Sequence, residues 1–135
     1  MGDTDILETL EFTVDGIPVP QGSKSLFRGR MVDANRNLKP WRATVTRAAK
    51  DAIAERPGFD DAVYVLLDFY MPRGKTVRRS RPSVKPDLDK LIRSIFDALT
   101  DAGAWTDDGL VVSVHAQQWY AGDKPHVRIK IGTLV

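Results

Sequence analysis

Four aspartates that could bind a metal lie in two pairs, one on either side of a short predicted helix. Asp87 and Asp89 form the first pair, and Asp107 and Asp108 form the second. Carboxylate oxygens are the ligands that Mg²⁺ prefers, but two unit charges about 4 Å apart repel by about 4 kcal/mol at an effective dielectric near 20. Such a cluster is unfavourable unless a cation neutralises it. The pattern therefore predicts a divalent-metal site.

A basic segment leads into the first pair of aspartates. It contains no acidic residue and almost no apolar one, and proline and glycine interrupt it, so we expect a mobile surface loop at about 73–86. Guanidinium and ammonium groups attract a phosphate backbone. Beside clustered carboxylates they predict metal-dependent phosphodiester chemistry. The candidate DNA-binding residues are Arg73, Lys75, Arg78, Arg79, Arg81 and Lys85, with Lys24 nearer the N-terminus.

The composition limits the class of protein. A chain of 135 residues with 42% hydrophobic residues is long enough for one domain with a real core. Cysteine is absent, which excludes disulfides, thiolate zinc sites and cysteine nucleophiles. No apolar run approaches the roughly 20 residues that span a bilayer, and the N-terminal residues lack the pattern of a signal peptide. We therefore expect a soluble protein without a membrane partner, in the cytoplasm of a bacterial cell or a phage-infected host.

Hydrophobic periodicity predicts the elements that position these residues. Alternating segments indicate strands and helical spacing indicates amphipathic helices. We expect strands at 10–17, 63–71, 111–119 and 127–131 and helices at 41–53 and 88–102. The strand at 63–71 has two largely apolar faces, which favours a central position, and the last two strands are expected to form a hairpin around 121–125. The order predicts an α+β fold, a single domain in which two main helices pack against a small mixed sheet.

The length of the second helix tests whether the aspartates can meet. A helix over 88–102 spans about 22 Å, whereas residues 103–108 reach at most about 20 Å. A return of Asp108 to Asp87 is barely possible. Either the helix is shorter or bent and the chain doubles straight back, which we prefer, or Asp108 completes a site with carboxylates of a second subunit.

Each candidate also has an ordinary structural explanation. Asp87 and Asp89 stand at a helix start, where aspartate caps free N–H groups, and Asp107-Asp108-Gly109 is a good turn. Arg93 lies four residues beyond Asp89 and four before Asp97, a spacing typical of a solvated ladder worth about 0.3–0.5 kcal/mol per pair. Lys90 could instead approach a scissile phosphate. The two histidines stand at no metal-ligand spacing.

Residues 86–100, followed by 103–108 and Val111-Val112, resemble the RusA-type Holliday-junction resolvases. Residues 16–22 are similar, less specifically, to the N-terminal segment of that family. The resemblance implies a homodimeric, Mg²⁺-dependent endonuclease, with Mn²⁺ able to substitute. Its partner would be branched DNA, which it would cut at four-way junctions by paired nicks during recombination and repair.

The resemblance also implies roles for individual residues. Asp87, Asp89 and Asp108 fall on the family's catalytic, metal-binding carboxylates, with Asp107 adjacent. Lys90 stands where asparagine is common, and Arg93 stands where the family usually has a catalytic lysine. In addition, Gln118 replaces a lysine often found in the following strand. Because arginine keeps the charge but is not readily deprotonated, Arg93 can stabilise charge on the attacked phosphate but is poorly suited to donate a proton.

Two other functions remain open at this point. The chain could be a branched-DNA-binding module without catalysis, in which the carboxylates only cap and turn. It could also be a nuclease for flaps or other branched DNA. Divalent-ion titration separates the first from an enzyme, and a panel of branched and linear substrates separates the second.

Overall fold

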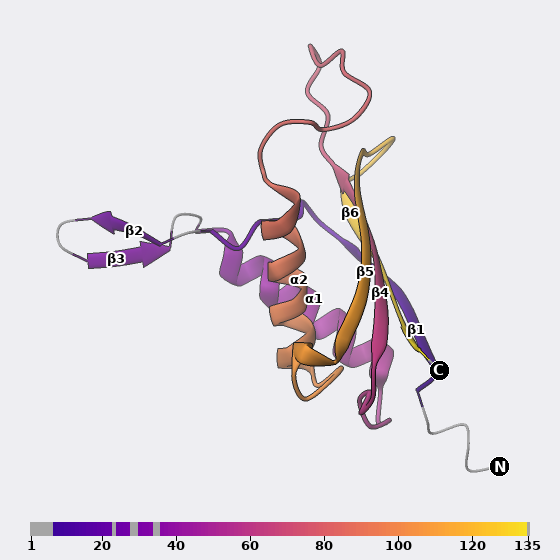
Figure 1. Cartoon of the computed structure of the whole chain (residues 1–135). Coiled ribbons are helices and arrows are strands. Elements are labelled where there is room, and N and C mark those ends of the chain that lie inside the picture. The colour runs from indigo at the N-terminus through magenta and orange to yellow at the C-terminus, as the bar shows by residue number, and fades with distance from the viewer. Residues whose placement is uncertain (1–6, 23, 28–29, 34–35, 135) are drawn as a thin grey trace.

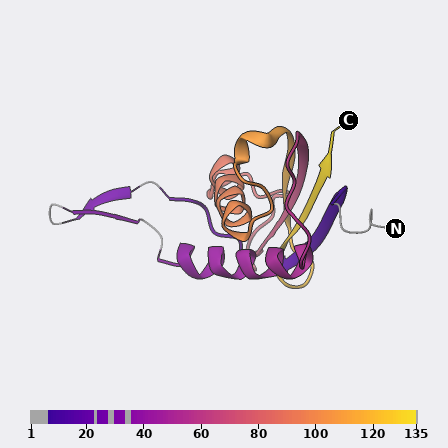
Figure 2. The ribbon, with the colours of Figure 1, turned by 90° about the horizontal axis from the view of Figure 1, so that it is seen from below.

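A computed structural model describes residues 7–22, 24–27, 30–33 and 36–134, with side chains for 7–22 and 36–134 (Figure 1). It confirms the predicted α+β fold, in which one mixed sheet carries both helices on one face (Figure 2). No helix in the described ranges is long and apolar enough to cross a membrane. The elements are β1 (Thr9–Asp15), β2 (Lys24–Phe27), β3 (Arg30–Asp33), α1 (Leu38–Ile53), β4 (Val63–Met71), α2 (Leu88–Ala102), the short 3₁₀ helix η2 (Asp108–Leu110), β5 (Val111–Tyr120) and β6 (His126–Thr133).

The four-stranded sheet has the order β1-β6-β4-β5. The central position predicted for β4 is confirmed, but the predicted hairpin of the last two strands is wrong, because β4 lies between them. The crossover through α2 makes β5 parallel to β4 and places it at one edge. The chain then crosses back, so that β6 pairs antiparallel with β1 and β4. In that position Val127, Ile129 and Ile131 are fully buried.

The segment before α1 also differs from the prediction. No strand was predicted there, yet β2 and β3 pair antiparallel from Lys24 opposite Asp33 to Phe27 opposite Arg30. This ribbon extends away from the sheet and helices (Figures 1 and 2). Lys24, a predicted DNA contact, belongs to β2, but its side chain lies outside the part of the chain whose side chains are described. The structure therefore does not test the prediction that Lys24 contacts DNA.

The core lies between the sheet and the two helices. One face of β4 buries Val63, Val65, Leu67, Phe69 and Met71, which pack with the apolar stripes of α1 and α2. Each such aliphatic or aromatic side chain contributes about 1.5–3 kcal/mol on burial. The opposite face of β4 is more open than predicted, with Leu66 37% exposed. The helices are thus held to one side, and their outer faces remain available to ligands.

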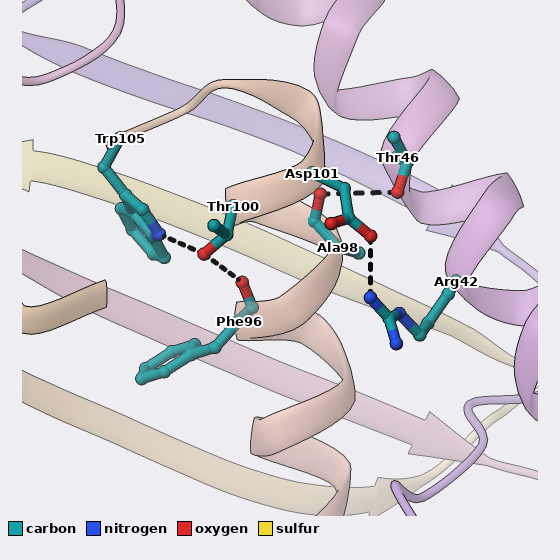
Figure 3. Close-up of polar contacts among 7 residues, drawn as sticks. All are labelled: Arg42, Thr46, Phe96, Ala98, Thr100, Asp101 and Trp105. Carbon is teal, nitrogen blue, oxygen red and sulfur yellow. Dashed lines mark hydrogen bonds and ion pairs between the residues drawn. The ribbon is translucent and has the colours of Figure 1, made fainter. Parts of the chain in front are cut away.

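Two polar contacts join the helices. The Arg42 guanidinium donates to the Asp101 carboxylate at 2.7 Å, and the Thr46 hydroxyl donates to the Ala98 carbonyl oxygen at 3.3 Å (Figure 3). The first is an exposed ion pair, a class worth about 0–1 kcal/mol. These contacts add little energy beside the buried stripes, but they fix which faces of α1 and α2 adjoin.

Candidate functional site

A groove runs along the outer face of α2. It has a volume of about 240 Å³ and is lined by Asp89, Ile92, Arg93, Phe96 and Asp97 of the helix, and by Asp108 at the start of η2. Because these helical residues recur at intervals of one, three or four, they share one face. The groove therefore brings together two of the predicted metal ligands and the predicted phosphate-binding arginine.

Asp108 reaches this groove because the chain turns back immediately after α2. Gly103 takes a left-handed conformation with φ 80°, and its N–H bonds the carbonyls of Leu99 and Thr100, a C-cap that favours glycine. Trp105, only 2% exposed, then donates from its indole Nε1 to the Thr100 hydroxyl at 2.7 Å and meets Phe96 edge to face (Figure 3). The helix keeps its full predicted length, so Asp108 lies along its side and not at its N-terminus.

The carboxylate of Asp87 lies outside this groove. It lines an adjoining pocket of about 450 Å³ with residues of the basic loop and Gln118. Asp87 occupies the N-cap position of α2, but its side chain makes no capping hydrogen bond; its backbone oxygen accepts from the N–H groups of Lys90 and Leu91. Lys85 Nζ lies 3.9 Å from its Oδ2 atom. Helix capping therefore does not account for this carboxylate.

The neighbouring aspartates Asp107 and Asp108 have different surroundings. The Asp107 side chain accepts a hydrogen bond from the Gly109 N–H at 3.3 Å and so closes the turn into η2. The ordinary structural explanation therefore fits Asp107. Asp108 faces the groove, and no side-chain partner is found for it among residues 7–22 and 36–134. The four aspartates are thus divided between a groove, an adjoining pocket and a turn.

The predicted ladder of Asp89, Arg93 and Asp97 does not form ion pairs. None of the three, nor Asp108, has an oppositely charged partner within 4.0 Å in the described side chains. Three carboxylates therefore face one guanidinium across the groove without neutralising contacts. Since like charges repel, this arrangement favours binding of a cation.

The described residues include no group of three histidine, aspartate or glutamate side chains that could hold a metal ion. A closed protein cage for a metal is therefore not built by this part of the chain alone. Mg²⁺ commonly keeps several waters and is bound by one or two carboxylates together with substrate phosphates. Asp89 and Asp108 fit that open kind of site.

Only one of the two basic candidates on α2 lines the groove. Arg93 lines the groove, whereas Lys90 does not; the backbone oxygen of Lys90 accepts from the Gln21 N–H at 2.9 Å. Residues 19–21 therefore pack beside the first turn of the helix. Buried Ser94 strengthens this contact by donating to the Val19 carbonyl at 2.8 Å.

Part of the basic loop is held against the end of the sheet. The Arg81 guanidinium lies 3.5 Å from the centre of the Trp119 ring and donates to the Gln117 side chain at 3.2 Å. Arg79 donates to the Tyr120 hydroxyl at 3.3 Å, and Arg73 lies 5.5 Å above the same ring. Sequence analysis missed these contacts, for which the only signal is the aromatic pair that ends β5.

The other loop cations are less constrained. Lys75 and Arg78 are exposed and their side chains make no hydrogen bond or ion pair with the described residues, and the one ion pair found there for Lys85 is with Asp87. The loop therefore presents free cations from an anchored base. It stands beyond the sheet, next to the N-terminal end of α2 (Figure 1).

Residues 15–132 match the family model described as endodeoxyribonuclease RusA. The chain is also 40% identical over 72 residues to a protein of Shigella sonnei (strain Ss046) named crossover junction endodeoxyribonuclease RusA. That alignment covers 53% of this chain and 52% of the relative, so it spans about half of each.

Proposed function

The chain belongs to the endodeoxyribonuclease RusA family, and on that premise we propose that it is a Mg²⁺-dependent endonuclease that resolves four-way DNA junctions by paired nicks. The observation that carries the proposal is the groove in which Asp89, Arg93 and Asp108 meet without ion-pair partners. Those unpaired charges match the two components of such a reaction, a divalent cation and a phosphate.

We assign the ion to Asp89 and Asp108, with Asp87 at the adjoining pocket and Asp107 retained for the turn. When bound, Mg²⁺ would neutralise charge on the phosphate and lower the pKa of a bound water; Mn²⁺ is expected to substitute. Arg93 would contribute a permanent positive charge to the same phosphate. Ile92 and Phe96 form the apolar part of the lining, and by limiting water they strengthen these electrostatic interactions.

The DNA arms would be bound by the basic loop. Lys75, Arg78 and Lys85 present exposed charges, while Arg73, Arg79 and Arg81 hold the loop on the aromatic end of β5. Each phosphate contact releases counterions, so junction affinity should fall steeply with salt. Lys90 and Lys24 remain candidates for weaker contacts.

Paired nicks require two sites, so we propose a homodimer. The edge strand β5 supports this, because its outer edge is unpaired in the described sheet and Val112 and Val114 are 63% and 45% exposed. Such an edge is a template for strand pairing, and pairing about a two-fold axis would set both grooves on one side of a continuous sheet.

Mixing separately inactive Asp87→Asn and Asp108→Asn copies tests whether the site is shared between subunits. A site shared between subunits would recover activity in half of the sites of a mixed dimer. A site built within one protomer would stay inactive in the mixture.

The decisive experiment for the function compares substrates. Purified protein is incubated with four-way, three-way, flap and linear duplex DNA in Mg²⁺, and the symmetry of the nicks is mapped. Preferential, symmetric cutting of the four-way junction supports the proposal. Faster cutting of flaps or three-way DNA would instead assign the enzyme to other branched DNA.

A non-catalytic DNA-binding module is the second candidate. It is favoured because the described residues include no group of three acidic or histidine side chains placed to hold a metal ion, and because arginine stands at position 93, where the resemblance leads one to expect lysine. This candidate predicts tight junction binding without cleavage in either Mg²⁺ or Mn²⁺. Replacing Asp89 by Asn would then change nothing, whereas in an enzyme it abolishes cutting and leaves binding intact.

A further inference from the structure

A second groove lies where α1 packs against α2. We call it the basic groove, and we call the groove lined by Asp89, Arg93 and Asp108 the carboxylate groove. The basic groove has a volume of about 500 Å³, about twice that of the carboxylate groove, and the two share no lining residue. Its charged lining consists of Lys39, Arg42, Arg47 and Lys50 from α1 and Asp101 from α2. Four cations thus face one carboxylate.

The single carboxylate is already neutralised. Asp101 accepts the hydrogen bond from Arg42 at 2.7 Å (Figure 3), which leaves three further cations. For Lys39, Arg47 and Lys50 no ion pair or hydrogen bond of the side chain is found in the described structure. Asp51 of α1 and Glu55, which follows the helix, do not line the groove. The basic groove is therefore complementary to an extended anion.

The dimensions match a strand of duplex DNA. Lys39 and Lys50 are eleven residues apart on one helix, about 16 Å at 1.5 Å per residue. At about 3.4 Å of duplex axis per nucleotide of one strand, this length equals the axial rise of roughly five nucleotides. A compact anion such as a free phosphate would contact only one end of such a row, whereas a polyanionic backbone would contact all of it.

The basic groove also adjoins the carboxylate groove. Asp97 lines the carboxylate groove and Asp101 lines the basic one, and the two residues are a single turn, about 6 Å, apart on α2. A strand lying in the basic groove would therefore pass within about one helix turn of the carboxylate groove. From this juxtaposition we propose that α1 binds the phosphodiester backbone of a duplex arm next to the scissile position. The identification of the anion as DNA rests on the proposed function.

The test neutralises the unpaired cations together, in the variant Lys39→Gln, Arg47→Gln, Lys50→Gln. Binding to a labelled four-way junction is measured over a series of salt concentrations, without divalent ion. Loss of three phosphate contacts should reduce the slope of log K against log salt by about 2.7 and weaken binding on the order of 10-fold to 100-fold at low salt.

A matched control removes three cations that line neither groove, Lys124→Gln in the turn before β6 and Arg128→Gln and Lys130→Gln on β6. It changes the net charge equally but should leave the salt slope within about 1 of the parent. A second variant, Asp101→Asn, removes the one carboxylate and should tighten binding severalfold. Circular dichroism checks that each variant folds.

If the triple variant of the basic groove and the control lose affinity equally, or if Asp101→Asn weakens binding, the assignment of the basic groove to DNA is overturned. Failure of the nuclease proposal would give a different experimental result. In that case the parent protein cuts no junction with Mg²⁺ or Mn²⁺, while the binding measurements still report whether the basic groove contacts DNA.

Discussion

The two grooves that border α2 contain charges of opposite sign, and they differ in how those charges are satisfied. In the basic groove the only carboxylate, Asp101, is held by Arg42 at 2.7 Å. In the carboxylate groove three aspartates and Arg93 face one another with no ion pair among the described side chains. The Arg42–Asp101 pair is made within the protein, whereas the other charged groups of the two grooves have no ion-pair partner among the described side chains. One groove suits a cation and the other a polyanion.

The sharpest test of the carboxylate groove compares substitutions of two adjacent aspartates. Asp108 faces the groove and Asp107 closes a turn, so Asp108→Asn should lower the cutting rate by about 10³-fold, since several kcal/mol of metal-dependent stabilisation are lost at 1.4 kcal/mol per tenfold. Asp107→Asn keeps an oxygen that accepts from Gly109 and should cut within about threefold of the parent. Single-turnover rates on a four-way junction measure both. Equal losses in the two variants would show that the groove does not distinguish them.

Arg93 is the only cation that lines the carboxylate groove in the described structure. If it stabilises charge on the phosphate, Arg93→Gln should reduce the cutting rate by about 10²-fold. Arg93→Lys keeps the charge and should recover most of that loss. A rescue by lysine that fails, with junction affinity unchanged, would indicate that the planar guanidinium geometry matters more than the charge.

Sequence reasoning succeeded where the signal was local. The predicted bounds of β4 and α2 match the structure because their apolar periodicity is strong. The β5–β6 hairpin failed because a Gly-Asp-Lys-Pro turn looks the same whether the next strand pairs beside β5 or crosses over β4. Local signals do not specify which strand becomes the neighbour.

The candidate site was predicted only in part for a related reason. That Asp108 lies near α2 follows from the short connection after Gly103, but which side chains share a groove depends on their direction. Asp87 turns to the adjoining pocket and Asp107 to its own turn, although both stand beside groove residues in the sequence. The contact of Arg81 with Trp119 joins residues 38 positions apart, and no periodicity reports such a pair.

The connection after α2, which brings Asp108 back beside the helix, can be destabilised by a substitution that leaves the charged residues of the carboxylate groove unchanged. Thr100→Val removes the acceptor of the buried Trp105 indole N–H, which should lower the free energy of unfolding by about 1–3 kcal/mol. Thr100→Ser keeps the hydroxyl and should cost less than about 1 kcal/mol. Urea unfolding of the two variants and the parent measures the difference. If Thr100→Val and Thr100→Ser lower the free energy of unfolding equally, this hydrogen bond does not stabilise the connection after α2.

The smallest expected effect compares the two grooves directly, through the thermal stability of the protein without DNA. Mg²⁺ at about ten times its dissociation constant should stabilise the folded state by about 1.4 kcal/mol and raise Tm by about 3–6 °C. The rise should vanish in Asp89→Asn and persist in the Lys39, Arg47, Lys50 triple variant, because the proposed cation site lies in the carboxylate groove and not in the basic one. NaCl of matched ionic strength controls for screening. A rise of equal size in all variants would place the cation elsewhere and leave the carboxylates without a metal-binding role.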